Sequence, residues 1–414
     1  MTRAVDPSAL SELLDRPGVR VALSVLDVPG AETRLVGGCV RDALLGTQSA
    51  DIDLATTLLP QAVMAAARKV PDLKVVPTGI EHGTITLVTE EGPIEVTTLR
   101  EDVETDGRRA VVRFGGDFAR DAERRDFTVN ALSLGTDGRL HDTVGGLADL
   151  EARRVRFIGD PATRIREDAL RILRFFRFHA RFGAGPPDFA ALAACVAARD
   201  ALDNLSRERV RAEFLKLLAA AGGPPMIAIL GATGLLQRIT GGVAELGRLE
   251  RAEAAALPPV MRLGALSVGS RHDADRLRGR LRLSKQEHGL LTDYADALAD
   301  LHGRAVIDAG AARALTAEHG LQLLTAALSI LDGEPRPAVT HDARRALQEL
   351  RREGGAPSFP LAGADLVAAG MPPGPAIGRG LAAARKLWLE RGCPAGPASR
   401  ADLVARALAG ARDP

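Results

Sequence analysis

The sequence predicts an α/β head followed by an all-helical remainder. From Thr33 to about Leu150, short segments of alternating polarity, typical of strands, are mixed with helical segments. After Asp160, apolar residues recur at helical spacing almost to the end of the chain. Gly and Pro interrupt this spacing near 183–187, 222–225, 354–360 and 371–375. At 414 residues, rich in Ala, Arg and Leu and with one Trp and one Tyr, the chain should form about two to four mainly helical domains.

The elements of the head are predicted from local patterns. Residues 1–30 form a helical lead-in. Alternating apolar segments predict strands at Glu32–Val36, Asp51–Ala55, Lys74–Pro77, Gly83–Thr89, Pro93–Leu99 and Leu140–His141. Helical spacing predicts helices at Val40–Leu45, Pro60–Lys69 and Asp126–Leu134. Glu90–Gly92 is a hairpin turn between two of the strands.

Charge, cysteine content and hydropathy argue against a uniformly basic protein, a zinc or disulfide framework and a membrane-spanning protein. The formal net charge is only +1, so a polyanionic partner must be met by a local basic surface. The three cysteines are scattered without CxxC spacing, which favours neither a zinc site nor a disulfide framework and fits a reducing cytoplasm. The longest uncharged run, Leu217–Leu236, contains Gly222–Pro225 at its centre and predicts two helices joined by a turn, with no membrane span.

Two carboxylates behind a glycine turn are the strongest indication of chemistry. Asp51 and Asp53 project to the same side of a predicted strand, and clustered carboxylates repel unless a cation joins them. Mg²⁺ prefers oxygen ligands and often shares them with substrate phosphates. The preceding Gly37-Gly38 lets the backbone approach a phosphate, and Arg41 can fork onto its oxygens. This order of elements predicts a metal-dependent nucleotidyl-transfer site.

Glu95 is a candidate third carboxylate. It is a charged residue on an otherwise apolar strand, and it would complete the metal site if that strand neighboured Asp51–Ala55. An acid on a half-exposed strand face is an equally good interpretation of the sequence.

Two arginine-rich segments are candidates for nucleotide binding. The first segment is Arg124-Arg125-Asp126, in which guanidinium groups suit triphosphate oxygens and the carboxylate suits ribose hydroxyls. The alternative is that Asp126 only stabilises the start of its own predicted helix. From 151 to 181, nine arginines stand against four acids, an excess that suits a phosphate-bearing ligand rather than a solvated face. Within it, a predicted helical stripe recurs every three residues, at Asp168, Arg171, Arg174 and Arg177. A further cluster, Arg271–Lys285, is either an RNA-backbone contact or a solvated helix.

These motifs, in this order, resemble the class II tRNA nucleotidyltransferase and bacterial poly(A) polymerase family, most of all its CCA-adding members. The matching segments are Leu35–Gly46 with Asp51–Asp53, Glu95–Arg100, Arg124–Leu132, Gly145–Leu150 and Arg166–Arg177. Leu205–Val210 with Glu213–Leu218 is similar to the family's RNA-binding helices, and 361–408, with Trp388, to the tail of CCA-adding members. The resemblance implies a polymerase-β-like head at 1–150, a helical neck with the nucleotide-selecting motif at 151–204, an RNA-binding helical body at 205–300 and a tRNA-binding helical tail at 301–414.

The resemblance also implies roles for individual residues. Asp51 and Asp53 would hold Mg²⁺, and Glu95 would be the third catalytic carboxylate. Nucleotide binding would fall to Gly38, Arg41 and Arg125 for the triphosphate, Asp126 for the ribose, and Asp168, Arg171, Arg174 and Arg177 for the base and phosphates. The substrates would be ATP, CTP and the 3′ acceptor end of tRNA, in the cytoplasm, with neither a membrane nor a protein partner.

Alternatives remain within and outside the family. Family members that synthesise poly(A), or that add only A or only CC, have the same kind of head. The polar segment Arg100–Arg109 is similar to a flexible loop of members that switch from C to A, and this similarity favours full CCA addition. An inactive RNA-binding relative would be expected to have lost Asp51, Asp53 or Arg125. A dinucleotide-binding oxidoreductase would need GxGxxG spacing, which the Gly37-Gly38 site lacks.

Overall fold

The computed structural model describes residues 8–49, 51–105 and 110–411, with the backbone alone for 101–105 and 110–113. The chain divides into two compact units, residues 1–238 and 239–414, which are described separately below. The predicted four-part division into head, neck, body and tail is finer than this and stays a prediction.

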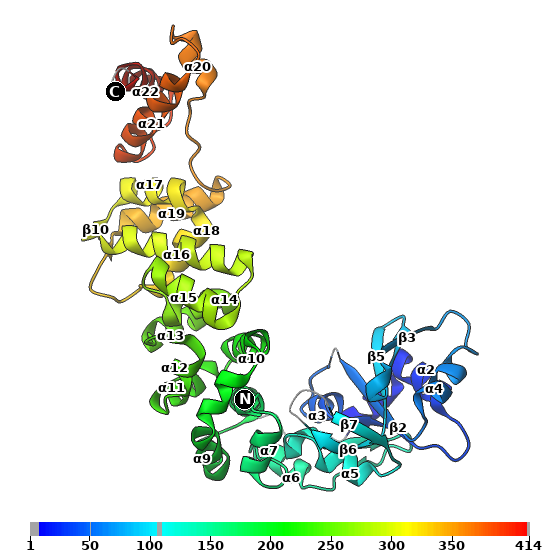
Figure 1. Cartoon of the computed structure of the whole chain (residues 1–414). Helices are drawn as coiled ribbons and strands as arrows, with labels where there is room; N and C mark the ends of the chain where they lie inside the picture. The colour runs from blue at the N-terminus through cyan, green and yellow to red at the C-terminus, as the bar shows by residue number, and fades with distance from the viewer. Residues whose placement is uncertain (1–7, 50, 106–109, 412–414) are drawn as a thin grey trace. The chain divides into compact units, whose positions relative to one another are not determined.

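A seven-stranded mixed sheet forms the core of the head, the N-terminal part of the first unit (Figure 1). Its strand order is β3-β4-β5-β2-β1-β8-β9. The strands are β1 (Thr33–Val36), β2 (Ile52–Thr56), β3 (Lys74–Gly79), β4 (Thr84–Thr89), β5 (Gly92–Thr98), β8 (Ser133–Gly135) and β9 (Leu140–His141). Five neighbouring pairs are antiparallel, and β2 with β5 is the parallel one. In that pair Asp53 lies opposite Glu95, so the strand adjacency required for a three-carboxylate site is present.

Helices pack against this sheet through apolar residues at helical spacing. The chain enters through α1 (Ala9–Asp15) and α2 (Pro17–Leu26), which confirms the helical lead-in over the described residues. Helix α2 buries Val19, Ala22 and Val25 and contacts β4, β5 and α4 (Pro60–Ala67). Helix α3 (Gly38–Leu44) contacts β1 and β2 instead. The predicted positions of β1 to β5 and of α3 and α4 are therefore confirmed to within a few residues.

A separate hairpin and several short helices complete the head. The hairpin pairs β6 (Arg100–Thr105) with β7 (Ala110–Phe114); the tip of the predicted switching loop, 106–109, lies outside the described residues. The short helices are η1 (Ile80–His82), α5 (Phe118–Glu123), η2 (Thr128–Asn130) and α6 (Gly146–Glu151).

The prediction of one helix at Asp126–Leu134 is wrong. Phe127 is extended, only 128–130 form a 3-10 turn, and the chain then enters β8. The segment pairs with a distant one: Thr128 N donates to Arg156 O at 3.1 Å, and Ile158 N donates to Asp126 O at 3.1 Å. Rings reinforce the pairing, with the Phe127 and Phe157 rings tilted by 45° and their centroids 4.8 Å apart. This tertiary pairing outweighs a weak local preference for helix.

Helices alone make up the rest of the first unit. They are α7 (Pro161–Glu167), α8 (Arg171–Phe182), α9 (Phe189–Ala197), η3 (Arg199–Asn204), α10 (Arg207–Ala219), α11 (Gly223–Ala232) and α12 (Leu235–Thr240), the last of which ends in the second unit. The two helices and turn predicted across 217–236 are confirmed by α10 and α11. Helix α8 contacts α7, α10 and α11 and buries Phe175 and Phe176 completely.

The second unit is helical apart from one small strand pair. Its helices are α13 (Leu246–Ala254), α14 (Pro259–Ser267), α15 (Arg271–Leu281), α16 (Lys285–His302), α17 (Ala309–His319), α18 (Leu321–Ile330), α19 (His341–Arg352), α20 (Gly363–Ala368), α21 (Pro375–Glu390) and α22 (Pro397–Gly410). Parallel β10 (Val306–Ile307) and β11 (Ala338–Val339) are a small departure from the all-helical prediction, formed where buried Ile307 brings two connections together.

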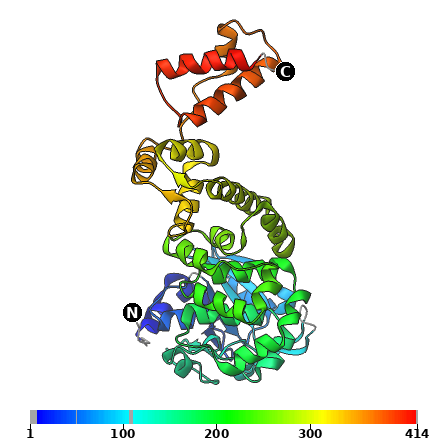
Figure 2. The same ribbon diagram turned by 90° about the vertical axis from the view of Figure 1, so that its left-hand side faces the viewer.

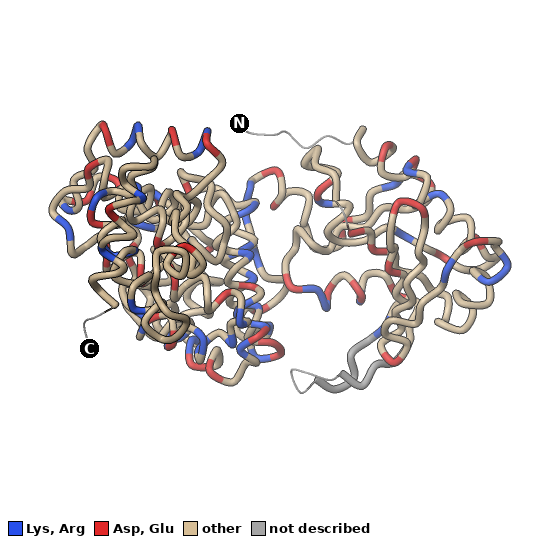
Figure 3. Tube along the Cα trace, turned by 90° about the horizontal axis from the view of Figure 1, so that it is seen from above, with Lys and Arg blue, Asp and Glu red and all other residues tan. Residues whose placement is uncertain are grey.

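The last three helices of the second unit lie together (Figure 2). Their apolar side chains pack around Trp388. Trp388 is 2% exposed, and its indole N–H donates to Pro394 O at 3.2 Å. Basic and acidic positions are interspersed along the trace (Figure 3), in keeping with the net charge of +1. Among the described residues, no helix is both long and apolar enough to cross a membrane.

Candidate active site

A polar cavity of about 830 Å³ opens in the first unit at β2, the start of α3, the 124–130 segment and α8. Ten of the eleven residues predicted for the site line it, and Glu95 is the exception. The lining includes eight arginines and five aspartates. Such an excess of positive charge suits a ligand that carries several negative charges. The sequence had placed these residues in four separate motifs, and the fold gathers them around one space.

The carboxylates lie at the β2 side of this cavity. Asp53 is half-buried and Asp51 is exposed. Burial raises the pKa of the Asp53 carboxyl, and the neighbouring Glu95 and Asp51 raise it further against the opposing effect of Arg125. Carboxylate oxygens of this kind are the ligands that a hard divalent cation prefers. The residues therefore fit a divalent metal ion, whose binding would relieve their mutual repulsion.

Glu95 stands apart from the other two carboxylates. Its side chain is exposed on β5 and does not line the cavity. Three His, Cys, Asp or Glu side chains could together hold a metal ion where their potential ligand atoms all lie within 4.8 Å of one another. The only group among the described residues that meets this criterion is Asp300, Glu318 and His319, a largely exposed group in the second unit. The strand register brings Glu95 next to Asp53 without forming a closed trio of ligand atoms, so its catalytic role stays a prediction.

The Gly37-Gly38 turn connects β1 to α3 at the cavity wall. Gly37 has φ of +76°, and a Cβ there would lie 2.7 Å from Arg125 Nη1. The positive φ favours glycine at this position, and a Cβ would also displace the end of the Arg125 side chain. Arg125 thus packs directly on the turn, with its Nη2 donating to Asp121 Oδ2 at 3.2 Å.

Arg41 is a buried residue at the end of the first turn of α3. It is 4% exposed, lies 4.3 Å over the Phe182 ring, and donates to Asp42 Oδ1 at 2.7 Å and to Asn130 Oδ1. Burial lowers the pKa of the Arg41 guanidinium, and the adjacent Asp42 opposes that shift. Much of its donor capacity is used inside the protein, so its predicted contact with phosphate depends on the remaining N–H groups.

Asp126 is held in place by α8 and by its own segment. Arg174 Nε donates to its Oδ2 at 2.6 Å, and Asn130 Nδ2 donates to its Oδ1 at 2.9 Å. Burial alone would raise the pKa of this carboxyl, but Arg174 and Asn130 outweigh it and hold the pKa below its usual value. Asp126 is therefore an ionised acceptor at the cavity wall.

The predicted helical stripe is only partly present. Asp168 is not on the helix with the arginines: it follows the end of α7 in an extended conformation (φ −151°), and α8 begins at Arg171. The break arises because Asp168 Oδ1 accepts from Leu170 N at 3.0 Å, a local bond that competes with helix, while its Oδ2 accepts from Arg209 at 2.7 Å. Asp168 and Arg171 remain on the same cavity, across a turn instead of along one helix.

The two remaining arginines of the stripe lie on α8. Arg174 pairs with Asp126, and Arg177 Nε donates to Glu213 Oε2 at 2.6 Å. The guanidinium of Arg177 lies 4.3 Å over the Phe178 ring. These contacts orient both cations toward one side of the helix.

Several lining residues were not predicted individually. Asn130, four residues after Asp126, connects that carboxylate to Arg41; an amide at this spacing was a usable signal. Arg209 of α10 was assigned to an RNA-binding helix, and nothing local in the sequence places it beside Asp168. Arg124 was part of the predicted Arg124-Arg125-Asp126 segment but was given no role of its own, and Arg181 was counted only in the arginine excess of 151–181.

Comparisons with known proteins fit this geometry. The model of the poly A polymerase head domain matches residues 33–156, and that of the probable RNA and SrmB-binding site of polymerase A matches 188–245. The mitochondrial CCA tRNA nucleotidyltransferase 1 of Danio rerio is 35% identical over 367 residues, covering 86% of this chain and 83% of the relative. The CCA-adding enzyme of Limosilactobacillus fermentum is 34% identical, covering 90% and 92%. The chain belongs to the CCA-adding tRNA nucleotidyltransferase family.

Solved structures agree with this family. The Bacillus stearothermophilus CCA-adding enzyme in complex with CTP matches with a TM-score of 0.68 at 26% identity, over 91% of this chain and 93% of that one. The Thermotoga maritima enzyme complexed with tRNA matches over 99% of both chains with a TM-score of 0.71; at 20% identity it shows the shared fold. The predicted family, the polymerase-β-like head with a helical remainder, nucleotidyltransferase activity and CCA addition are confirmed, and the family implies a divalent metal ion.

Proposed function

We propose that the cavity binds Mg²⁺ and the incoming CTP or ATP, and that a tRNA 3′ end is extended there by C, C and A. The observation that carries this proposal is the arrangement of Asp51 and Asp53 on one wall and of the lining arginines on the others. Bound at Asp51 and Asp53, Mg²⁺ would supply activation of the RNA 3′-hydroxyl and charge stabilisation at the α-phosphate and leaving pyrophosphate. Glu95, beside Asp53 in the sheet, is the proposed third carboxylate.

The triphosphate is assigned to Gly38, Arg41 and Arg125. Arg125 packs on the Gly37-Gly38 turn, and both the turn and the guanidinium line the cavity. Arg174 and Arg177 are assigned to the phosphates and base from the side of α8. Asp126 would accept from a ribose hydroxyl through the acceptor site that Arg174, Asn130 and the backbone N–H of Phe127 leave available.

Asp168 and Arg171 are the proposed base-reading pair. Cytosine and adenine each offer an amino donor next to a ring-nitrogen acceptor, whereas uracil and guanine present a carbonyl acceptor next to an N–H donor. A carboxylate accepts and a guanidinium donates, so the pair complements C and A and opposes U and G. This choice needs no nucleic-acid template. Each mismatched charged contact should cost about 1–3 kcal/mol, or roughly ten- to a hundredfold in kcat/KM.

The body and tail are assigned to tRNA. We propose a neck at 151–204 that carries the nucleotide-selecting motif, an RNA-binding body at 205–300 and a tRNA-binding tail at 301–414, acting in the cytoplasm. The match of residues 188–245 to an RNA-binding model supports the body assignment.

Stepwise nucleotide addition tests the proposal. Transcripts of tRNA ending at the discriminator base, at C, or at CC are incubated with CTP, ATP or both, in Mg²⁺. We expect addition of C, C and A in turn, followed by a stop. Long A tails without C, or addition of A alone to every transcript, would refute it. The base-reading pair is tested separately by Arg171→Ala, which should lower CTP and ATP incorporation and narrow their advantage over UTP.

A further inference from the structure

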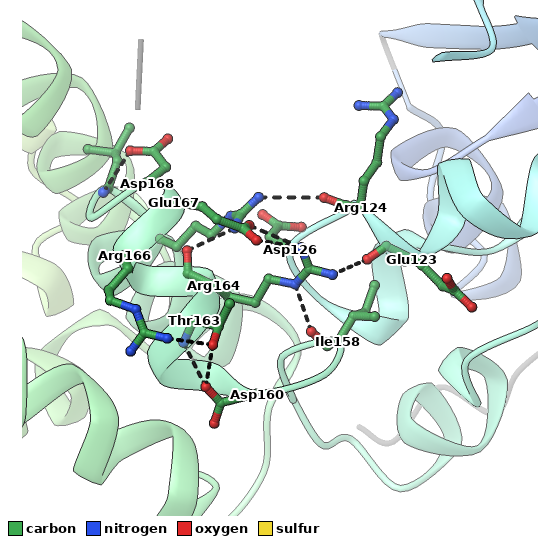
Figure 4. Close-up of polar contacts among 12 residues, drawn as sticks. Glu123, Arg124, Asp126, Ile158, Asp160, Thr163, Arg164, Arg166, Glu167 and Asp168 are labelled. Atoms are coloured by element: carbon green, nitrogen blue, oxygen red, sulfur yellow. Dashed lines mark hydrogen bonds and ion pairs between the residues drawn. The ribbon is translucent and has the colours of Figure 1, made fainter. Parts of the chain in front are cut away.

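Arg164 connects two parts of the site without lining the cavity. It lies on α7, and its guanidinium donates to Ile158 O at 2.9 Å and to Glu123 O (Figure 4). Its Nη1 also donates to both carboxylate oxygens of Glu167, at 3.1 and 3.0 Å. The side chain is 18% exposed. One planar guanidinium thus bonds to the end of α5, to the 156–158 segment and to the residue that precedes Asp168.

Glu167 passes this connection on to Arg171. Arg171 Nη1 donates to Glu167 Oε2 and to Arg164 O, the latter at 2.8 Å, and its Nη2 lies 3.5 Å from Arg124 O. Both Nη1 hydrogens are therefore used inside the protein, which leaves Nε–H and an Nη2–H as the donor edge for a ligand. Burial alone would raise the pKa of the Glu167 carboxyl, but hydrogen bonds from Arg171 and Arg164 outweigh burial and lower it. Glu167 is thus an ionised acceptor that holds Arg171 in one orientation.

We propose that Arg164 is a positioning residue for nucleotide choice, because it fixes the donor edge of Arg171 relative to the 123–126 segment. That segment ends in Arg125 and Asp126, the groups assigned to triphosphate and ribose. Anchoring Glu123 and Glu167 to one guanidinium sets the distance between the sugar-phosphate groups and the base-reading groups. The proposal rests on the assignment of Arg171 to the base, and Arg164 itself touches no substrate.

The same helix offers a matched control. Arg166, two residues further on, is exposed and donates to Thr163 Oγ1 at 2.7 Å within its own helix (Figure 4). Arg166→Ala removes the same charge and side-chain length from α7 without touching Glu167. Any effect of charge alone on tRNA or nucleotide binding should therefore appear in both variants.

The experiment measures kcat/KM for CTP, ATP, UTP and GTP on one tRNA transcript, with wild type, Arg164→Ala, Arg164→Lys, Arg166→Ala and Arg171→Ala. We expect Arg164→Ala to reduce the CTP:UTP ratio by roughly tenfold. Arg164→Lys should also reduce it, because a point-like ammonium cannot bond to Glu167 and two carbonyls together. Arg166→Ala should leave the ratio at the wild-type value. If Arg164→Ala fails to fold, as judged by circular dichroism, Arg164→Lys carries the test.

The outcomes separate the two assignments. If Arg171→Ala narrows the ratio while both Arg164 variants keep it, the base-reading pair stands and the positioning role of Arg164 is refuted. If Arg171→Ala keeps the ratio, the base-reading assignment itself fails. A purely structural role for Arg164 predicts an equal loss for all four nucleotides, with the CTP:UTP ratio unchanged, and that result also refutes the proposal.

Discussion

Replacing Asp53 by Asn should destroy nucleotidyl transfer and yet stabilise the metal-free protein. The pKa of the Asp53 carboxyl is raised by burial and by Glu95 and Asp51, so the folded state holds the proton more tightly than the unfolded chain does. The unfolded state then binds fewer protons between the two pKa values, and stability falls as pH rises through that window. Above both pKa values the cost of the charge is fully present, and Asp53→Asn removes it.

The part of the gain that comes from like-charge repulsion can be worked from the strand register, and relief of burial adds to it. Asp53 and Glu95 are directly opposite in β2 and β5. Two like charges about 6 Å apart repel by about 0.7 kcal/mol at a dielectric constant of ~80 and by about 2.8 kcal/mol at ~20. The exposure of Glu95 favours the lower end, so we expect a gain of about 1 kcal/mol in the unit that contains the site.

Urea unfolding followed by circular dichroism measures this gain at pH 7.5 with EDTA, at pH 7.5 with Mg²⁺, and below pH 4. The gain in stability should be present with EDTA. It should shrink with Mg²⁺, because only wild type can bind the ion tightly. It should vanish in acid, where the Asp53 carboxyl is protonated in both the folded and the unfolded state. Glu90→Gln, an exposed acid in the β4–β5 turn, is the control and should change neither stability nor transfer. A variant that is no more stable than wild type in EDTA, or that gains equally with Mg²⁺, would contradict the metal-site reasoning.

Three further substitutions test other parts of the site. Arg174→Ala leaves buried Asp126 without its main cation, so the pKa of Asp126 should rise and stability at pH 7 should drop by about 2–4 kcal/mol. This loss should shrink as pH falls through the low native pKa of Asp126, because wild type then also loses the ion pair. A loss of stability that does not depend on pH would argue against an ionised Asp126. Gly37→Ala should weaken nucleotide binding and lower the unfolding midpoint, since it strains a backbone with φ of +76° and pushes Arg125; unchanged KM for CTP would count against the turn as a phosphate contact. Gly107→Pro, in the segment predicted to act as a switching loop, should spare C addition and impair the final A, as measured with transcripts ending at the discriminator and at CC; equal loss of both additions would exclude a switch.

Local patterns were sufficient for β1 to β5, α3 and α4 of the head. The Asp51–Asp53 strand, the Gly37-Gly38 turn and the neighbouring helices follow from alternation, turn residues and helical spacing, each of which acts within a few residues. The adjacency of Glu95 to Asp53 could be stated only as a condition, because strand order is set by contacts distant in sequence.

The two errors near the site have the same physical origin. At Asp126–Leu134 the backbone pairs with 156–158, a partner that periodicity does not reveal. At Asp168 the side chain binds Leu170 N and Arg209 and interrupts what spacing predicts as one helix. An Asp that binds the backbone two residues on is a recognised local alternative to helix, so this break had a signal in the sequence, whereas the position of Arg209 had none.

The arginines of the cavity are ordered before any ligand arrives. Each of the eight donates to a carboxylate of the protein, and the pairs are Arg41 and Arg181 with Asp42, Arg124 and Arg125 with Asp121, Arg171 with Glu167, Arg174 with Asp126, Arg177 with Glu213, and Arg209 with Asp168. A guanidinium has five N–H groups in a fixed plane, so one or two internal bonds set the direction of the others. The arginine side chains therefore lose their conformational entropy when the protein folds, and nucleotide binding does not have to order them again. A protein that selects bases without a template needs its donors fixed in this way, because a freely rotating guanidinium could turn away from a mismatched acceptor pattern and discrimination would be lost.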